Sequence, residues 1–134
     1  MKPAEEILGA VGFSVMAVRP GDTCVALGVG DIPVVSQSHL INLMEHAIVI
    51  SLDEYLEPGE TTIAISIELI SLSPAEIGAE LRATSRCIEV NNRELTFECE
   101  LYEGERQVAA AIIKRATVER ISFLARTAAQ SLIS

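Results

Sequence analysis

Basic residues are scarce in this sequence, and their scarcity excludes a general affinity for polyanions. Ten lysine and arginine residues stand against nineteen aspartate and glutamate residues, which gives a formal net charge of −9. Such a charge opposes attraction to DNA, to RNA and to an anionic membrane surface. We therefore expect no nucleic-acid partner.

Long apolar runs and an export signal are also missing. No run reaches the ~18 apolar residues that a membrane-spanning helix needs. The N-terminal stretch MKPAEEILGAVGFSVMAV has one lysine and then two glutamates, without the basic front and small-residue cleavage site of a signal peptide. We expect a cytoplasmic protein that is not bound to a membrane.

Cysteine pairs and metal-ligand spacings are absent as well. Cys24, Cys87 and Cys99 form no C-x-x-C motif and lie in apolar or alternating stretches, as is typical of reduced thiols that pack as small hydrophobic groups. His39 and His46 are seven residues apart, with no cysteine or third carboxylate beside them. We expect free thiols and no metal site.

The residues that are present predict one α+β domain over residues 1–134. Nearly half of them are apolar, and a chain of this length buries roughly two thirds of the surface that its unfolded form exposes. Alternation with a period of two indicates strands. Such alternation occurs at 13–18, 23–30, 61–73 and 81–90, and on both sides of the turn EGER within 95–120. We expect the first two runs to form a hairpin around RPGD, and residues 121–134 to be helical.

A long helix is predicted between GDIPVVSQS and the loop signal EPGE. Ser38 is the expected N-cap, and the helix should end at about Tyr55 or Leu56. Residues 40–52 are almost entirely apolar, and such a helix cannot face water. We therefore expect the antiparallel sheet to wrap around the helix and a second subunit to cover its remaining side.

Glu45 is the only carboxylate in the apolar part of this helix. Burial disfavours the charged form, so the group must resist ionisation or find a partner. A structural ion pair, for example with an arginine, is one interpretation. Ser38, Asn42 and Glu45 share one helix face, close to N-terminal N–H groups that can hold an oxyanion. This alignment favours the other interpretation, in which an unpaired Glu45 acts as general base or nucleophile.

The remaining polar residues of the helix give weaker signals. His46 lies roughly 100° from Glu45 around the helix, so the two cannot form an acid–base pair, and a core or interface position is expected. His39 falls in the first turn, where it either meets a ligand or is exposed. The sequence has no G-x-S-x-G motif, and it indicates no aspartate–histidine relay for Ser36 or Ser38.

Several segments resemble the fluoroacetyl-CoA thioesterase-like branch of the hotdog-fold thioesterases. These are VVSQSHLINLMEHA, YLEPGETT, LSPAEIGAEL, EVNNRELTFECELYEGERQVAAAIIKRATV and Phe123, and the resemblance runs from about Val11 to Arg126. It implies a hotdog fold, an antiparallel sheet around one long helix. It also implies a homodimer, or a dimer of dimers, that binds acyl-CoA between subunits, and a catalytic role for Glu45. Coenzyme A is then part of the substrate, and no cofactor is expected.

The sequence departs from the family pattern at two further catalytic positions. Eight residues before the glutamate the family usually has threonine or serine, and this chain has Gln37. Seven residues before Gly78 the family usually has histidine, and this chain has Ser71. Gln37 can donate its amide to a thioester carbonyl, whereas serine cannot replace histidine as an acid or base at neutral pH.

The leading hypothesis is hydrolysis of a small or medium acyl-CoA thioester to the free acid and CoA. The expected catalytic positions are Glu45, Gln37 and Ser71. The expected substrate-binding residues are Ser36, Ser38, His39, Asn42, Lys114 and Arg115. The last two and Arg120 supply cations for the CoA phosphates, unless they form an ordinary solvated edge with scattered salt bridges.

Three other hypotheses remain open at this stage. Gln37 and Ser71 favour a non-catalytic protein that binds acyl-CoA or an acyl group. A hydratase of this fold is less favoured, because the known hydratases have an aspartate and a histidine five residues apart, while Asp31 and His39 are eight apart. A purely structural dimer is the fourth hypothesis.

Overall fold

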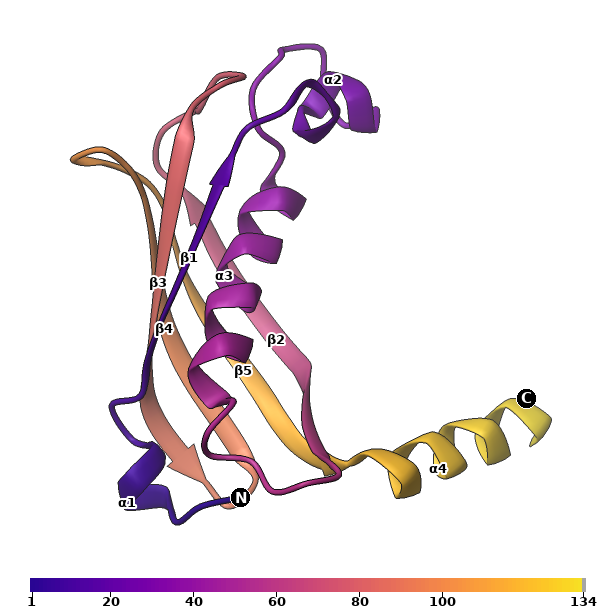
Figure 1. Ribbon diagram of the computed structural model, residues 1–134. Coiled ribbons are helices and arrows are strands. Elements are labelled where there is room, and N and C mark those ends of the chain that lie inside the picture. Colours follow the sequence, from indigo (N-terminus) through magenta and orange to yellow (C-terminus); the bar gives the residue numbers. More distant parts are fainter. Residues whose placement is uncertain (134) are drawn as a thin grey trace.

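A five-stranded antiparallel sheet, with one long helix against its concave face, organises the chain (Figure 1). The computed structural model describes residues 1–133. The strand order is β1-β3-β4-β5-β2. The strands are β1 (Val11–Ala17), β2 (Glu60–Ser71), β3 (Glu80–Asn91), β4 (Glu94–Glu103) and β5 (Arg106–Glu119). The helices are α1 (Ala4–Ile7), the 3-10 turn η1 (Pro20–Asp22), α2 (Cys24–Leu27), α3 (Gln37–Leu52) and α4 (Arg120–Ile133).

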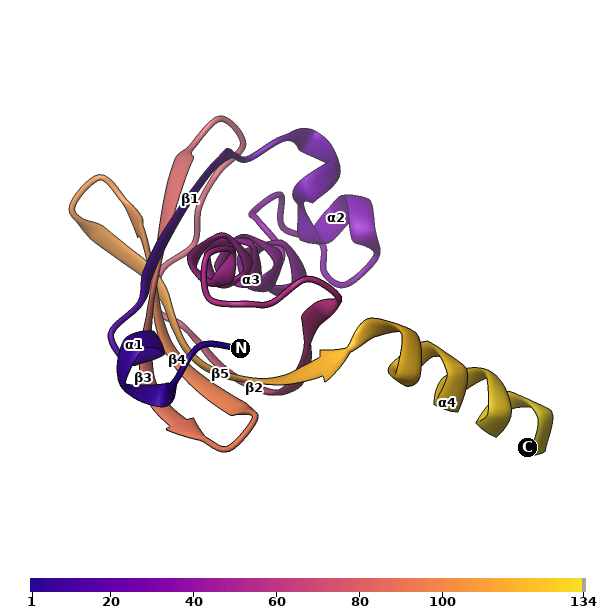
Figure 2. The ribbon, with the colours of Figure 1, turned by 60° about the horizontal axis from the view of Figure 1, so that its bottom comes forward.

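The sheet curls around α3 (Figure 2), as the sequence predicts. Ser36, not Ser38, is the N-cap, because its hydroxyl accepts the N–H of His39. The helix also ends earlier than predicted, at Leu52. The N–H of Tyr55 donates to the Leu52 carbonyl at 2.9 Å, and the Tyr55 carbonyl accepts the Lys2 N–H at 2.8 Å. These bonds turn the chain toward the N-terminal segment instead of continuing the helix.

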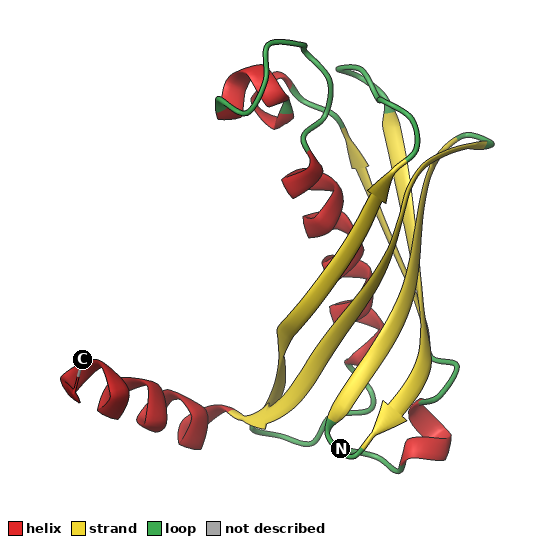
Figure 3. Cartoon of the chain, turned by 180° about the vertical axis from the view of Figure 1, so that it is seen from behind, coloured by secondary structure: helices red, strands yellow, loops and turns green. Residues whose placement is uncertain are grey.

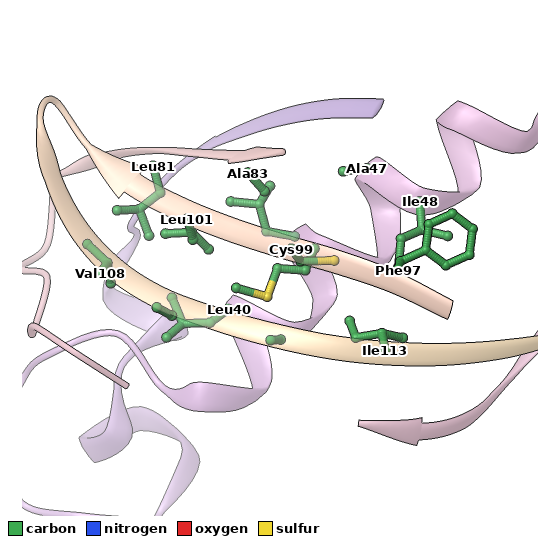
Figure 4. Packing of buried hydrophobic residues seen from close by; sticks show 14 of the residues in the cluster. Leu40, Ala47, Ile48, Leu81, Ala83, Phe97, Cys99, Leu101, Val108 and Ile113 are labelled. Carbon is green, nitrogen blue, oxygen red and sulfur yellow. The ribbon is translucent and has the colours of Figure 1, made fainter. Parts of the chain in front are cut away.

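The core lies between α3 and the concave face of the sheet (Figure 4). The buried residues of α3 are Leu40, Leu43, Met44, Ala47, Ile48, Ser51 and Leu52. Opposite them, alternate residues of β4 are fully buried, namely Leu95, Phe97, Cys99 and Leu101. The period-two alternation of this strand is therefore confirmed.

Gly12 allows β1 to cross α3 at very short range. A Cβ atom built on Gly12 would lie 1.9 Å from the Ala47 carbonyl oxygen. No side chain fits there, so glycine is required by space and not by backbone conformation. This contact sets the distance between the edge strand and the helix.

The predicted hairpin of residues 13–30 is wrong. Residues 24–27 form the short helix α2, because Thr23 caps it by accepting the Ala26 N–H at 3.2 Å, and Gly28 ends it in the left-handed conformation. Strand β1 instead pairs with β3, Phe13 lying opposite Thr84. The sheet thus has five strands, and α2 lies beyond the N-terminal end of α3 (Figure 1).

Strand β2 follows its predicted alternation only in part. Ile63, Ile67 and Leu69 are half-buried, but Ile65 is exposed. The register against β5 shifts between Ala64 and Ser66, so Ile65 lies in a β-bulge and points away from Ile63, Ile67 and Leu69, with which a period of two would group it. The predicted strands at 81–90 and within 95–120 are confirmed.

Over residues 121–133 the tail forms the predicted helix, α4, which projects away from the body (Figure 3). Ser134, the last residue of the predicted helix, lies outside the described residues. All three cysteines are free, as expected. Burial, helped by the charges of Glu45 and Glu98, raises the pKa of Cys99 to about 12. Within residues 1–133, no helix is long and apolar enough to cross a membrane.

Candidate active site

Glu45 lies near the middle of α3 and forms an ion pair with Arg115 of β5. The Arg115 Nη1 atom is 2.6 Å from Glu45 Oε2. Two further bonds fix the guanidinium, because Nε donates to Thr62 Oγ1 and Nη2 donates to the Thr62 carbonyl, both at 2.9 Å. The expectation of an unpaired carboxylate is therefore wrong. A charge in an apolar surrounding needs a partner, and Arg115 supplies it.

This pair leaves part of the carboxylate accessible. The side chain of Glu45 is 25% exposed and that of Arg115 is 10% exposed. Among the described residues, only Arg115 bonds the carboxylate, and it does so through Oε2. The second oxygen, Oε1, is therefore left to accept a proton from water or a substrate.

Gln37 and Ser71, which are 34 residues apart, meet at the start of α3. The Gln37 side-chain amide donates to Ser71 Oγ at 2.7 Å. Both line a cleft of about 360 Å³ whose other walls are largely apolar. The fold thus brings together the two positions at which the sequence departs from the family pattern, and it joins them directly.

A second polar network occupies the first turn of α3. His39 Nε2 is 3.0 Å from Asp22 Oδ1, and His39 Nδ1 is 2.9 Å from Ser36 Oγ. Ser36 Oγ is in turn 3.0 Å from Ser38 Oγ. The expectation that Ser36 and Ser38 lack an aspartate–histidine relay is therefore wrong, since Asp22 and His39 supply one.

Asp22 is buried but remains charged. Burial alone would raise the pKa of this carboxyl, but the backbone N–H and the guanidinium of Arg19, together with His39, lower it below its usual value. The Arg19 N–H donates to Asp22 Oδ2 at 2.9 Å. The η1 turn thus holds an ionised carboxylate against the imidazole of His39.

A wider cleft of about 530 Å³ lies between α3 and the end of β1. Its walls are Val15, Met16, Ala17, Arg19, His39, Asn42, Leu43 and His46. Asn42, a predicted substrate-binding residue, lies in this cleft with His39. His46 is exposed, and its Nδ1 lies 3.1 Å from Ser14 Oγ.

The predicted cation cluster does not lie on one surface. Lys114 is exposed, whereas the next residue, Arg115, is buried and directed toward Glu45, because successive strand residues point to opposite faces. Arg120 lines a third cleft, of about 440 Å³, together with Val49 and Thr62. No group of three or more histidine, cysteine, aspartate or glutamate side chains within residues 1–133 is arranged to hold a metal ion.

Sequence reasoning missed two residues that support these networks, Asp22 and Thr62. Asp22 follows RPG and was assigned to a turn, so nothing in the local pattern indicates that it faces a histidine 17 positions later. Thr62 belongs to an alternating strand whose apolar side was predicted to carry Ile63 and Ile67, so the sequence indicated neither its burial nor its bonds to Arg115. Only the tertiary fold reveals both contacts.

The architecture is that of the hotdog fold, and solved structures share it. A hot-dog-like protein from Thermanaerovibrio acidaminovorans superposes with a TM-score of 0.86 at 20% identity, covering 94% of this chain and 95% of that one. A hypothetical protein from Thermus thermophilus, described as a thioesterase superfamily member, gives a TM-score of 0.88 at 20% identity, covering 98% and 96%. The fold class is therefore that of the hotdog proteins, thioesterases among them.

The sequence narrows this class to one family. The model of the FlK family, fluoroacetyl-CoA-specific thioesterase, matches residues 18–121. The chain therefore belongs to this thioesterase family. A point mutant of FlK, solved in complex with fluoroacetate and CoA, superposes with a TM-score of 0.78 at 22% identity, covering 87% of this chain and 98% of that one. A search among curated protein sequences gave no significant match.

Proposed function

We propose that this chain hydrolyses a small or medium acyl-CoA thioester to the free acid and CoA. The observation that carries the proposal is the Glu45 carboxylate, which Arg115 holds at 2.6 Å while a quarter of its side chain stays exposed. Family membership supplies the thioester class. The related FlK structure was solved with fluoroacetate and CoA, which supports a CoA thioester with a short acyl group.

Glu45 acts in this proposal as general base or nucleophile. As a base, its free oxygen takes a proton from water, the water oxygen attacks the thioester carbonyl, and the carbon–sulfur bond then breaks. As a nucleophile, the carboxylate attacks the carbonyl carbon, the carbon–sulfur bond breaks and CoA leaves as the thiolate, and water then hydrolyses the resulting anhydride to the free acid and the Glu45 carboxylate. Arg115 orients the carboxylate in both cases, which is a more specific role than the phosphate contact that the sequence suggested.

The first turn of α3 lies eight residues, roughly 12 Å along the helix axis, before Glu45, so it is the proposed site for a more distant polar group of the substrate and not for the carbonyl that Glu45 attacks. The N–H of His39 is already bonded to Ser36, so the N–H groups of Gln37 and Ser38 are the proposed donors. The Gln37 amide has a second N–H beyond the one that bonds Ser71. Asn42, one turn later on the same face as Ser38, is proposed to orient the acyl group.

The direct test is CoA release from a panel of acyl-CoAs, followed with a thiol reagent. We expect the wild-type protein to release CoA from short and medium acyl chains, and Glu45→Ala to lose this activity. If no substrate releases CoA faster than buffer alone, or if Glu45→Ala matches the wild type, hydrolysis by this site is ruled out.

We also propose that the chain works as a homodimer that pairs along the β2 edge. Strand β2 lies at one edge of the sheet, and Ile65 in its bulge is 49% exposed. On the adjacent face of α3, Val49 is 50% exposed and lines a cleft with Thr61 and Thr62. A second copy placed there would cover these apolar groups and close the open side of the Glu45 site.

The oligomeric state is measured by light scattering after size exclusion. We expect the wild type to have the mass of a dimer, or of a dimer of dimers, and Ile65→Lys to shift it toward the monomer while circular dichroism stays unchanged. An unchanged mass for the folded variant would contradict pairing along β2.

The bond between Gln37 and Ser71 favours one second candidate, a protein that binds acyl-CoA without hydrolysing it. These two side chains satisfy each other, and neither exchanges a proton readily at neutral pH. Calorimetric titration with the same panel separates the candidates. Saturable binding without CoA release would support the binding protein, while turnover would exclude it.

A further inference from the structure

Asp22 of η1 and three residues at the start of α3, His39, Ser36 and Ser38, form a hydrogen-bonded chain with a defined polarity. Asp22 is ionised and can only accept, so the His39 Nε2 atom that faces it must carry a proton. In the neutral imidazole the other nitrogen, Nδ1, then has a lone pair. That nitrogen must accept the hydroxyl proton of Ser36, which lies 2.9 Å away.

The same reasoning extends to Ser38. Since the Ser36 proton points at His39, Ser36 Oγ acts as acceptor toward Ser38, whose Oγ lies 3.0 Å away. The Ser38 hydroxyl therefore donates inward, and its own lone pairs remain for a group outside. Protonation of His39 reverses the chain, because Nδ1 then donates to Ser36. One proton can thus pass from Ser38 to His39.

Burial distinguishes the two serines. Ser36 is 1% exposed, so no substrate reaches its oxygen, and it can serve only to pass a proton. Ser38 is exposed and lies one helical turn before Asn42, which lines the cleft of about 530 Å³. Of the two serines, only Ser38 can therefore meet a ligand.

We propose that Ser38 is an acyl acceptor, activated by a proton relay through Ser36 and His39 to Asp22. The proposal rests on the proposed function for its substrate class, a thioester, and it adds a covalent step. The Ser38 Oγ atom forms a bond to the acyl carbon and the carbon–sulfur bond breaks. The Ser38 proton moves through Ser36 to His39 Nδ1, and CoA leaves as the thiolate, which takes a proton from solvent. Water then attacks the acyl-serine ester and gives one proton to solvent, the bond between the acyl carbon and Ser38 Oγ breaks, the acid leaves, and the serine recovers its proton from His39 through Ser36.

His39 is not the only imidazole at this cleft. Asp22 faces its Nε2 atom, and Ser36 faces its Nδ1 atom. Arg19 and His46 line the same cleft. His46→Gln is therefore the variant that separates the contribution of the second imidazole from that of His39.

The probe is p-nitrophenyl acetate, an activated ester without CoA. We expect a burst of p-nitrophenolate close to one equivalent per chain, and an acetyl group on the peptide that contains Ser38, identified by mass spectrometry. Ser38→Ala should lose both signals, and His39→Gln should slow the burst by about 100-fold or more. Ser131→Ala, which alters an exposed serine of α4, is the matched control and should leave the burst unchanged.

A burst that persists in Ser38→Ala, or an acetyl group found only elsewhere, overturns the proposal. If Ser38→Ala does not fold, the position of the acetyl group on the wild-type chain decides alone. The outcome is independent of the proposed function. Acyl-CoA hydrolysis that needs Glu45 but never acylates Ser38 would contradict only the acyl-acceptor role of Ser38. Acetylation of Ser38 without release of CoA from any acyl-CoA would contradict the proposed hydrolysis.

Discussion

The two polar sites on α3, one around Glu45 and one around His39, differ in the partners that compensate their buried polar groups. In the middle of the helix, Glu45 and Arg115 form an ion pair between residues 70 positions apart, and Thr62 completes it. In the first turn, Asp22 and His39 join two serines in a chain of mostly neutral groups that ends at the surface. The first arrangement fixes a charge, and the second can pass a proton.

This difference shows what each site can contribute to catalysis. A carboxylate held by a buried guanidinium keeps its position, which suits a base or nucleophile that must be in place before the substrate arrives. In the chain of two hydroxyls and an imidazole, Asp22 sets the direction of the hydrogen bonds while His39 is neutral, and a proton that reaches His39 reverses that direction. The two sites therefore answer differently to mutation and to pH.

The largest effect on stability is expected from breaking the ion pair. Arg115→Met leaves Glu45 as an uncompensated charge, and removal of one partner of a buried pair typically costs about 3–5 kcal/mol. We expect the loss at the lower end of this range, because Glu45 is partly exposed. Urea unfolding followed by circular dichroism measures it.

The double variant Arg115→Met with Glu45→Gln provides the control for this prediction. Removal of both charges should recover part of the lost stability, because no unpaired ion remains. Equal stability of the single and double variants would mean that lost packing, and not the stranded charge, explains the effect.

The sequence alone predicted the helix that carries Glu45 and the opposite wall of the core, but it did not predict the partner of Glu45. The apolar run around Glu45 predicted a helix with a carboxylate that needs explanation, and the alternation at 95–101 predicted the opposite wall of the core. Arg115 lies on a different element, and no local pattern links it to Glu45. The unpaired carboxylate was therefore the wrong choice between two interpretations that the sequence left open.

The first turn shows a second limit of sequence reasoning. Residues 23–30 look like a strand by alternation, yet the Thr23 cap and Gly28 make residues 24–27 a helix. Because the predicted hairpin placed Asp22 in the turn between two strands, its contact with His39 could not be foreseen. In so short a segment, the cap at Thr23 determined the local structure, and the alternation of apolar residues did not.

A smaller, pH-dependent effect is expected from the first turn. Asp22→Asn should cost about 2 kcal/mol at neutral pH, because hydrogen bonds to a buried charge are lost. The pKa of Asp22 is lowered in the folded protein, so its contribution is present above the unfolded value of about 3.9 and disappears as the pH falls through the lower, folded value.

Thermal unfolding of the wild type and Asp22→Asn between pH 7 and pH 3 checks this prediction. The two stability curves should approach each other only in the acidic part of the range. A constant gap down to pH 3 would show that the charge of Asp22 is not what stabilises the turn. Arg19 and His39 both face this carboxyl, so Arg19→Gln serves to separate their contributions.

The smallest effect is expected where the polar contact is exposed. Gln37 and Ser71 bond each other at the surface, and a neutral hydrogen bond contributes only about 0.5–1.5 kcal/mol. A double-mutant cycle with Gln37→Ala and Ser71→Ala should give a coupling energy of about 0.5 kcal/mol. A coupling of several kcal/mol would place this pair with the ion pair of Glu45 as a structural determinant.

The central claim is that Glu45 performs the chemistry while Arg115 holds it, and Glu45→Gln tests this claim most directly. Glutamine has nearly the same shape and can still accept the bond from Arg115, but it is neither a base nor a nucleophile. We predict that kcat/KM for a short acyl-CoA falls by about 10²–10⁴-fold with little change in the urea midpoint. Glu105→Gln, in the exposed turn between β4 and β5, should match the wild type. A Glu45→Gln protein that folds normally and hydrolyses acyl-CoA at the wild-type rate would contradict the account.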